Sequence, residues 1–129
     1  MAAFDLSFTA MLVHEMDATF RHEWRILPLL NLISDDDLAR DVFILLHIPL
    51  CWLLLSATRG SSMARALFSI FSIIHVGLHC LLRNHPKYEF NNPVSWFIIL
   101  LSGVAGFVHL MVSWSGPSAT PPKASGKEA

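Results

Sequence analysis

The chain has 129 residues, of which 53% are hydrophobic, and a formal net charge of -1. A chain of this length forms one domain, and an apolar content this high, with a mean hydropathy of +0.51, is unusual for a soluble domain of its size. It carries no cluster of Lys and Arg of the kind that neutralises phosphates, which excludes a nucleic-acid partner. The composition therefore predicts a protein embedded in a lipid bilayer.

The first apolar segment, from about residue 6 to residue 30, is interrupted at residues 14–25 by the polar sequence HEMDATFRHEWR. At about 100° per residue, several of these polar side chains share one face of a helix. Such a helix either crosses the bilayer with its polar face toward other helices or lies flat at the membrane surface. Apolar runs on both sides of the polar block favour a crossing over about 6–30.

Three further runs without charged residues predict membrane spans over about 42–58, 66–83 and 94–114. Their lengths fall at or close to the roughly 17 to 25 residues that a helical span requires. Pro49 is expected to kink the second helix just after His47. The aromatic residues expected to anchor the spans at the membrane interface are Trp52, Tyr88, Trp96 and Trp114.

The connections between the runs are short, which forces neighbouring helices to be antiparallel. The predicted fold is an all-α, integral membrane four-helix bundle of up-down-up-down topology within residues 1–115. Residues 116–129 are rich in Pro, Ala, Ser and Gly, and a disordered tail is expected there. The distribution of Lys and Arg around the spans predicts a multi-pass protein with both termini in the cytoplasm.

Histidines and acidic residues in the runs are expected to gather at two depths. Ionisable side chains are unfavourable in a bilayer, so those found there usually face an interior and carry function. With a rise of about 1.5 Å per residue, four histidines share one layer. This layer contains His22, His47, His75 and His79. The second layer contains His14, Glu15, Asp17 and His109.

The first layer predicts a metal site. His75 and His79 are spaced i, i+4, which places two imidazoles on one helix face at a spacing that suits one metal ion. Imidazole and carboxylate together suit iron, zinc or manganese, with iron or zinc expected here. The predicted metal ligands are His22, His47, His75, His79 and Glu15, with Glu23 as an alternative carboxylate. His85, in a loop beside a proline, is not expected to bind metal.

Two other interpretations of the histidines remain open. Two histidines on facing helices can bind b-type haem, and the candidate haem-binding pairs are His47 with His79 and His14 with His109. Alternatively, the histidines are neutral and hydrogen-bonded between helices. In that case a buried ion network is formed by Glu15, Asp17, Arg21 and Arg25.

The motifs HEMDATFRHEWRILP, HIPL and HVGLH resemble those of small four-helix membrane proteins of bacteria whose first helix carries His-Glu and His-Glu-Trp-Arg. That resemblance covers about residues 10–112, and those proteins have no established activity to carry over. The chain is also loosely similar to the HXXEE membrane family, from which it departs at Met16 and Asp17. Residues 75–79 resemble one histidine box of membrane di-iron hydroxylases and desaturases, which use three such boxes.

Three functions follow from these patterns. The preferred one is a metal-dependent membrane enzyme, acting by redox chemistry on a lipid-soluble small molecule. The second is a metal-free isomerase or cyclase with Glu15, Asp17 and His22 as general acid and base. The third is a non-enzymatic subunit or transporter component, in which the polar face of the first helix meets a homo- or hetero-oligomeric partner or lines an ion path.

Overall fold

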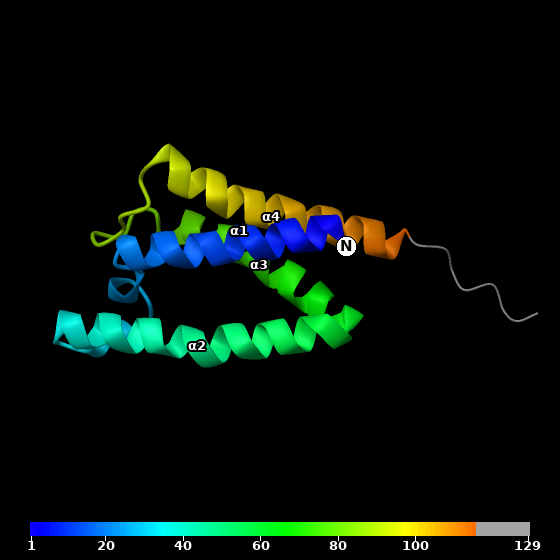
Figure 1. Cartoon of the computed structure of the whole chain (residues 1–129). Helices are drawn as coiled ribbons and strands as arrows, with labels where there is room; N and C mark the ends of the chain where they lie inside the picture. The colour runs from blue at the N-terminus through cyan, green and yellow to red at the C-terminus, as the bar shows by residue number, and fades with distance from the viewer. Residues whose placement is uncertain (116–129) are drawn as a thin grey trace, which may run out of the picture.

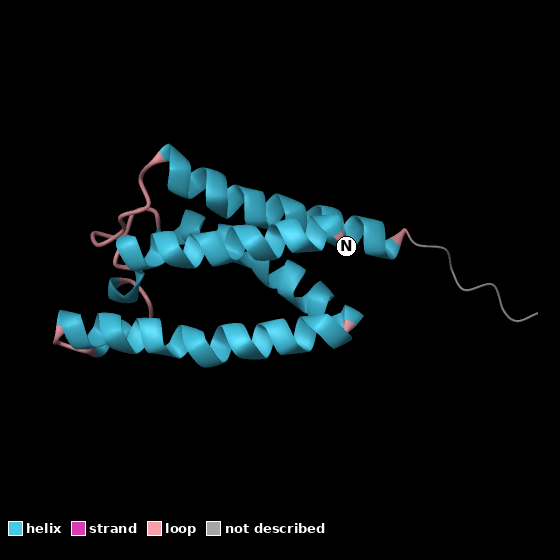
Figure 2. Ribbon diagram, viewed as in Figure 1, coloured by secondary structure: helices cyan, strands magenta, loops and turns pink. Residues whose placement is uncertain are grey.

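The structure, a computed structural model, describes residues 1–115, and it is helical in all its regular elements (Figures 1 and 2). The α-helices are α1 (Ala2–Phe20), α2 (Asp36–Gly60), α3 (Ser62–Leu82) and α4 (Pro93–Trp114). Two short 3₁₀ helices, η1 (Glu23–Arg25) and η2 (Leu30–Leu32), lie between α1 and α2. The all-α prediction is confirmed, whereas the predicted disordered tail falls on residues outside the described part of the chain.

Successive α-helices run in opposite directions. The start of α1, the α2–α3 hairpin and the end of α4 lie at one end of the molecule, on the right in Figure 1. The end of α1, the start of α2 and the loop between α3 and α4 lie at the other end. This arrangement is the predicted up-down-up-down topology.

Helices α2, α3 and α4 are long and apolar enough to cross a bilayer. Most of their apolar side chains point outward, since only 11% of the most apolar window is buried in α2, 22% in α3 and 39% in α4. Apolar surface this extensive is unfavourable in water and matches lipid. These helices indicate a multi-pass membrane protein. Helix α1, which carries acidic residues along its length, packs against α4 (Figure 1).

Small residues let α4 approach α1 and α3 closely. A Cβ atom on Gly106 would lie 3.0 Å from the carbonyl oxygen of Ser69 on α3 and 3.2 Å from Oγ of Ser7 on α1. Ser7 Oγ donates a hydrogen bond of 2.8 Å to the carbonyl oxygen of Ser102 on α4. Close contact through small residues is the usual way in which helices associate in membranes, and it makes α1, α3 and α4 the packed part of the bundle.

Helix α2 contacts the rest of the chain mainly near its two ends. Phe43, close to its start, belongs to the same buried cluster as Trp24, and the two ring centroids are 5.9 Å apart. Leu54, close to its end, packs against the buried Phe68 of α3. Between these contacts the helix continues through Pro49. Most side chains in its middle are exposed.

Helix α1 ends ten residues earlier than the span predicted to reach residue 30. The last helical residue is Phe20, and His22 has a positive φ of 54°, in the left-handed region. Pro28 accounts for part of the difference, because proline cannot donate an i to i−4 hydrogen bond and its ring clashes with the preceding helical turn. The chain instead reverses through η1 and η2 before α2 begins.

The contact between α3 and α4 predicts the effect of enlarging Gly103. A Cβ atom there would lie 2.5 Å from Cγ2 of Val76, whose β-branched side chain is stiff in a helix. We expect Gly103→Ala to lower the free energy of unfolding by about 1 to 3 kcal/mol, measured by thermal unfolding in detergent. Adding Val76→Ala should recover part of the loss.

Gly77→Ala is the matched control, because a Cβ atom on Gly77 of α3 would meet no atom within 4 Å. Alanine is the better helix former, so this variant should be neutral or more stable by about 0.5 to 1 kcal/mol. Equal stability of the Gly103→Ala and Gly77→Ala proteins would contradict the close α3–α4 contact.

Candidate functional site

The turn after α1 brings Glu23 back toward His14, nine positions earlier in the sequence. The left-handed backbone at His22 reverses the chain, and Glu23 then begins η1. One carboxylate oxygen of Glu23 lies 3.7 Å from Nε2 of His14, and the other lies 3.9 Å from Nε2 of His79. All three side chains are buried, so the turn places a carboxylate between two imidazoles in the interior.

His75 completes a group of four that we call the His–Glu cluster: His14, Glu23, His75 and His79. One potential ligand atom from each residue lies within 4.8 Å of all the others. Nε2 of His75 is 2.9 Å from Nε2 of His14 and 3.1 Å from Nε2 of His79. Three imidazole nitrogens from α1 and α3 and a carboxylate from η1 therefore converge on one point.

Hydrogen bonds alone do not give all of these ring nitrogens a suitable partner. A ring nitrogen of a neutral imidazole either donates one proton or offers one lone pair. Nε2 of His75 faces two other ring nitrogens at once, so one of the two contacts lacks a good donor–acceptor match. Three lone pairs directed at one cation would remove the mismatch. The nitrogen separations are close to the value of about 3.3 Å that tetrahedral geometry gives for zinc–nitrogen bonds of about 2.0 to 2.1 Å.

The buried carboxylate of Glu23 also fits a cation. Among the residues that the structure describes, no Lys or Arg side chain lies within 4 Å of it, and its neighbours are the imidazoles of His14 and His79. An ionised carboxylate is unfavourable in an apolar interior unless it is paired with a positive charge. A metal ion at the cluster would supply that charge.

Aromatic residues from the loop between α3 and α4 close one side of the cluster. The Phe90 ring centroid is 4.7 Å from that of His79 and 5.6 Å from that of His14. The hydroxyl of Tyr88 lies 3.1 Å from Nδ1 of His79, and burial raises the pKa of Tyr88 to about 12, so the hydroxyl keeps its proton. Its oxygen can accept a hydrogen bond from the Nδ1–H of His79, which leaves the lone pair of Nε2 free for a ligand. Nδ1 of His14 is the one buried side-chain polar atom without a partner in residues 1–115.

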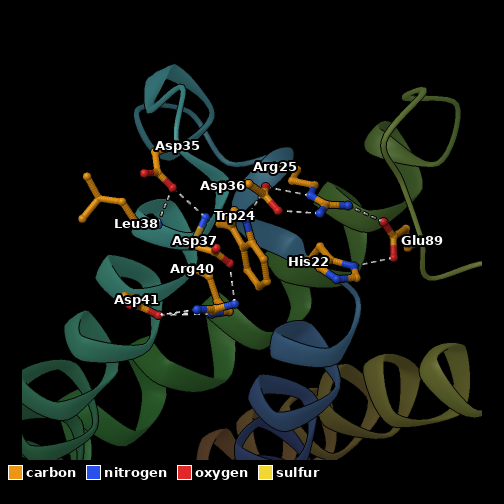
Figure 3. Close-up of polar contacts among 10 residues, drawn as sticks. All are labelled: His22, Trp24, Arg25, Asp35, Asp36, Asp37, Leu38, Arg40, Asp41 and Glu89. Atoms are coloured by element: carbon orange, nitrogen blue, oxygen red, sulfur yellow. Dashed lines mark hydrogen bonds and ion pairs between the residues drawn. The ribbon is translucent and has the colours of Figure 1, made fainter.

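A network of charged residues fixes the turn that carries Glu23 (Figure 3). Arg25 of η1 donates from Nη2 to Asp36 at 2.6 Å and from Nη1 to Glu89 at 3.3 Å. These hydrogen bonds, with that to Asp36 the largest contribution, raise the pKa of Arg25 above its usual value. Trp24 Nε1 donates to Asp36 at 3.0 Å, and His22 lies 2.8 Å from Glu89. The network joins η1 to the start of α2 and to the α3–α4 loop.

A cavity of about 310 Å³ lies between the cluster and α2, and we call it the α2–α3 cavity. Its polar lining residues are Glu15, Glu23, His47, His75 and His79. Its apolar lining residues are Leu27, Leu30, Phe43, Leu46, Leu50, Phe71, Leu78 and Leu82. The cavity therefore has one polar wall, which includes three members of the His–Glu cluster, and is otherwise lined by aliphatic and aromatic side chains.

Glu15 and His47 form a pair within the polar wall. Nε2 of His47 lies 2.8 Å from a carboxylate oxygen of Glu15. Nδ1 of His47 lies 2.7 Å from the carbonyl oxygen of Phe43, which can only accept, so Nδ1 carries a proton and donates it. The contact with Glu15 is thus a hydrogen bond with one proton between the two groups, and it spans the space between α1 and α2.

The structure brings two of the predicted metal ligands, His75 and His79, into the cluster. It does not bring the other three there: Glu15 and His47 bind each other in the cavity wall, and His22 binds Glu89 at the end of the bundle. His14 takes the expected place of His22. Because α1 ends at Phe20, His14 lies only about 9 Å from the end of its helix at 1.5 Å per residue.

The remaining predicted site residues lie elsewhere. Asp17 accepts a hydrogen bond from Ser95 and pairs with Arg21 at 3.3 Å. His109, predicted in the same layer as His14, lies 2.8 Å from Ser69 in the packed contact of α3 and α4. Of the proposed ion network, the Asp17–Arg21 pair is present, whereas Glu15 binds His47 and Arg25 binds acidic residues outside the first helix.

Sequence reasoning missed two residues that shape the site. The sequence pattern places His14 in the other layer and Tyr88 at the membrane interface, whereas His14 joins the cluster and Tyr88 is buried against His79. Pro28 was the signal that could have revealed the first error, because it argues against a helix continuing to residue 30. No sequence signal indicated that the α3–α4 loop folds back over the histidines.

A family model described as a family of unknown function (DUF6713) matches residues 1–116. Neither a curated protein nor a solved structure matches the chain.

The hydrogen bond between Tyr88 and His79 predicts an effect on metal affinity. Tyr88→Phe removes the hydroxyl that orients the His79 ring and keeps the aromatic packing against Phe90. Loss of such an outer contact lowers metal affinity by about 10- to 100-fold, and we expect this range for iron or zinc, measured by competition with a chelator. Unchanged affinity in Tyr88→Phe would show that this contact does not support a metal ligand.

Proposed function

Because the chain belongs to the DUF6713 family of unknown function, its activity has to be inferred from its site, and we propose that it is a metal-dependent membrane enzyme acting on a lipid-soluble substrate. The observation that carries this proposal is the convergence of three imidazole nitrogens and a buried carboxylate in the His–Glu cluster. The proposed metal ligands are His14, Glu23, His75 and His79.

The ligand set supports iron or zinc. Imidazole and carboxylate ligands bind both metals, whereas soft thiolate ligands are typical of other metal centres. The two cysteines, Cys51 and Cys80, are not members of the cluster, and Cys80 is exposed. We favour iron because it is redox-active. Redox chemistry can act on an apolar substrate, which offers few groups for acid or base catalysis.

The α2–α3 cavity supports a lipid-soluble substrate. Three members of the cluster, Glu23, His75 and His79, line it on one side, and leucine and phenylalanine side chains line most of the rest. Ligand sites usually combine an apolar lining with a few polar groups that orient the ligand. A substrate held in this cavity would have one end at the cluster.

A second candidate function is a metal-free isomerase, and the Glu15–His47 pair favours it. The pair holds one proton between a carboxylate and an imidazole at 2.8 Å in the wall of the same cavity. Groups of this kind can serve as general acid and base. In that case the His–Glu cluster would be a structural hydrogen-bonded group, and the purified protein would contain no stoichiometric metal.

Metal analysis tests the first function. We expect detergent-purified protein to contain iron or zinc at about one ion per chain, the stoichiometry of a single four-ligand site. His14→Ala, Glu23→Gln, His75→Ala and His79→Ala should each remove most of the bound metal, since each removes one proposed ligand. Elemental analysis of the purified variants gives the measurement.

His85→Ala is the control, because His85 is exposed and does not belong to the cluster. This variant should retain the wild-type metal content. The proposal fails if wild-type protein neither contains nor takes up iron or zinc, or if His85→Ala loses metal as completely as the cluster variants. An absorption spectrum with a Soret band would instead identify haem.

A further inference from the structure

We propose that the α2–α3 cavity binds the hydrocarbon chain of a single-chain amphiphile that enters sideways from the bilayer between α2 and α3. Its polar end would lie at the Glu15–His47 pair, beside the His–Glu cluster. This inference rests on the proposed function, because it names the class of substrate on which the proposed metal site acts.

The cavity opens on the lipid-facing side of the bundle. Leu46 and Leu50 of α2 and Leu78 of α3 line it, yet their side chains are 53%, 47% and 44% exposed. Both helices are candidate membrane spans, so the medium that these exposed leucines meet is the hydrocarbon of the bilayer. A molecule dissolved in the bilayer reaches the cavity without passing through water.

The lining changes character from the opening to the inner wall. Three of the leucines of α2 and α3 that line the cavity are about half exposed, whereas the side chains of Glu15 and His47 are 26% and 22% exposed. Hydrogen-bonding groups in a medium of low dielectric constant favour a ligand that offers a polar partner. The lining therefore matches a molecule with an apolar body and one small polar end, such as a long-chain alcohol.

The dimensions favour one chain over two. A volume of about 310 Å³ is at the lower end of the roughly 300 to 1,000 Å³ of ordinary ligand sites. Helix α2 contacts the rest of the chain near Phe43 and Leu54, and the cavity lies between these contacts. The hydrogen bond between His47 and Glu15 joins this middle part of α2 to α1.

A photoactivatable long-chain fatty alcohol, added to vesicles of phosphatidylcholine containing the purified protein, tests the proposal. We expect cross-links on the cavity-lining residues of α2 and α3, located by mass spectrometry of peptides. Leu50→Trp should fill the opening and lower this labelling about ten-fold, the change that loss of roughly 1.4 kcal/mol of binding produces. A hydroxyl-free analogue of the alcohol should label the same residues less.

Leu100→Trp is the matched control. Leu100 of α4 is 46% exposed, almost the same as Leu50, and it does not line the cavity. Labelling of the cavity should be unchanged in this variant. Labelling that is insensitive to Leu50→Trp, or that spreads evenly over the exposed faces of α2, α3 and α4, would overturn the proposal and show contact with bulk lipid only. If Leu50→Trp does not fold, Leu78→Trp makes the same test from α3.

The metal content of the same preparations separates this proposal from the proposed function. Leu50→Trp should keep its metal and lose labelling, whereas His14→Ala, at a cluster residue that does not line the cavity, should lose its metal and keep labelling of the leucines. Metal binding without specific labelling would overturn the lipid site alone. Specific labelling of a wild-type protein that binds no metal would overturn the metal-dependent function and leave the lipid site standing.

Discussion

Arg25 lies between two carboxylates, Asp36 and Glu89, and the rest of the site depends on these contacts. They join η1 to the start of α2, 11 residues along the chain, and to the α3–α4 loop, 64 residues along it (Figure 3). Exposed ion pairs contribute little one at a time, but a bidentate guanidinium contact fixes geometry as well as charge. Fixing η1 in this way keeps Glu23 pointed at the two imidazoles, and fixing the loop keeps Tyr88 against His79.

The interior of this protein is more polar than its surface, as expected for a chain whose outer faces meet lipid. Ser7, Ser69 and Ser102 are buried and hydrogen-bonded between helices, whereas large apolar residues of α2 and α4 point outward. In a bilayer, polar groups gain stability by finding partners within the protein. The His–Glu cluster differs from these satisfied contacts, because its ring nitrogens face one another without enough protons to pair them all.

Long uncharged runs made the three apolar helices predictable, since a span is fixed by length and hydropathy over about 20 residues. The i, i+4 pair of His75 and His79 was also predictable, because it depends only on the period of one helix. The identity of the residues that join His75 and His79 in the cluster was not predictable. It depends on where α1 stops, and the turn after His22 is held by contacts of Trp24 and Arg25 with Asp36 and of Arg25 with Glu89, which is 64 residues away. Depths measured along an uninterrupted helix therefore paired the histidines with His22 instead of His14.

Helix α2 contributes no side chain to the His–Glu cluster, although it forms one wall of the cavity beside it. Four lining residues of the proposed lipid site, Phe43, Leu46, His47 and Leu50, thus lie on a helix that holds no proposed metal ligand. In evolution, α2 could vary at Leu46 and Leu50 without disturbing the four cluster residues. This arrangement would let related proteins of this family differ in the molecules that they bind while the proposed metal ligands His14, His75 and His79 stay the same.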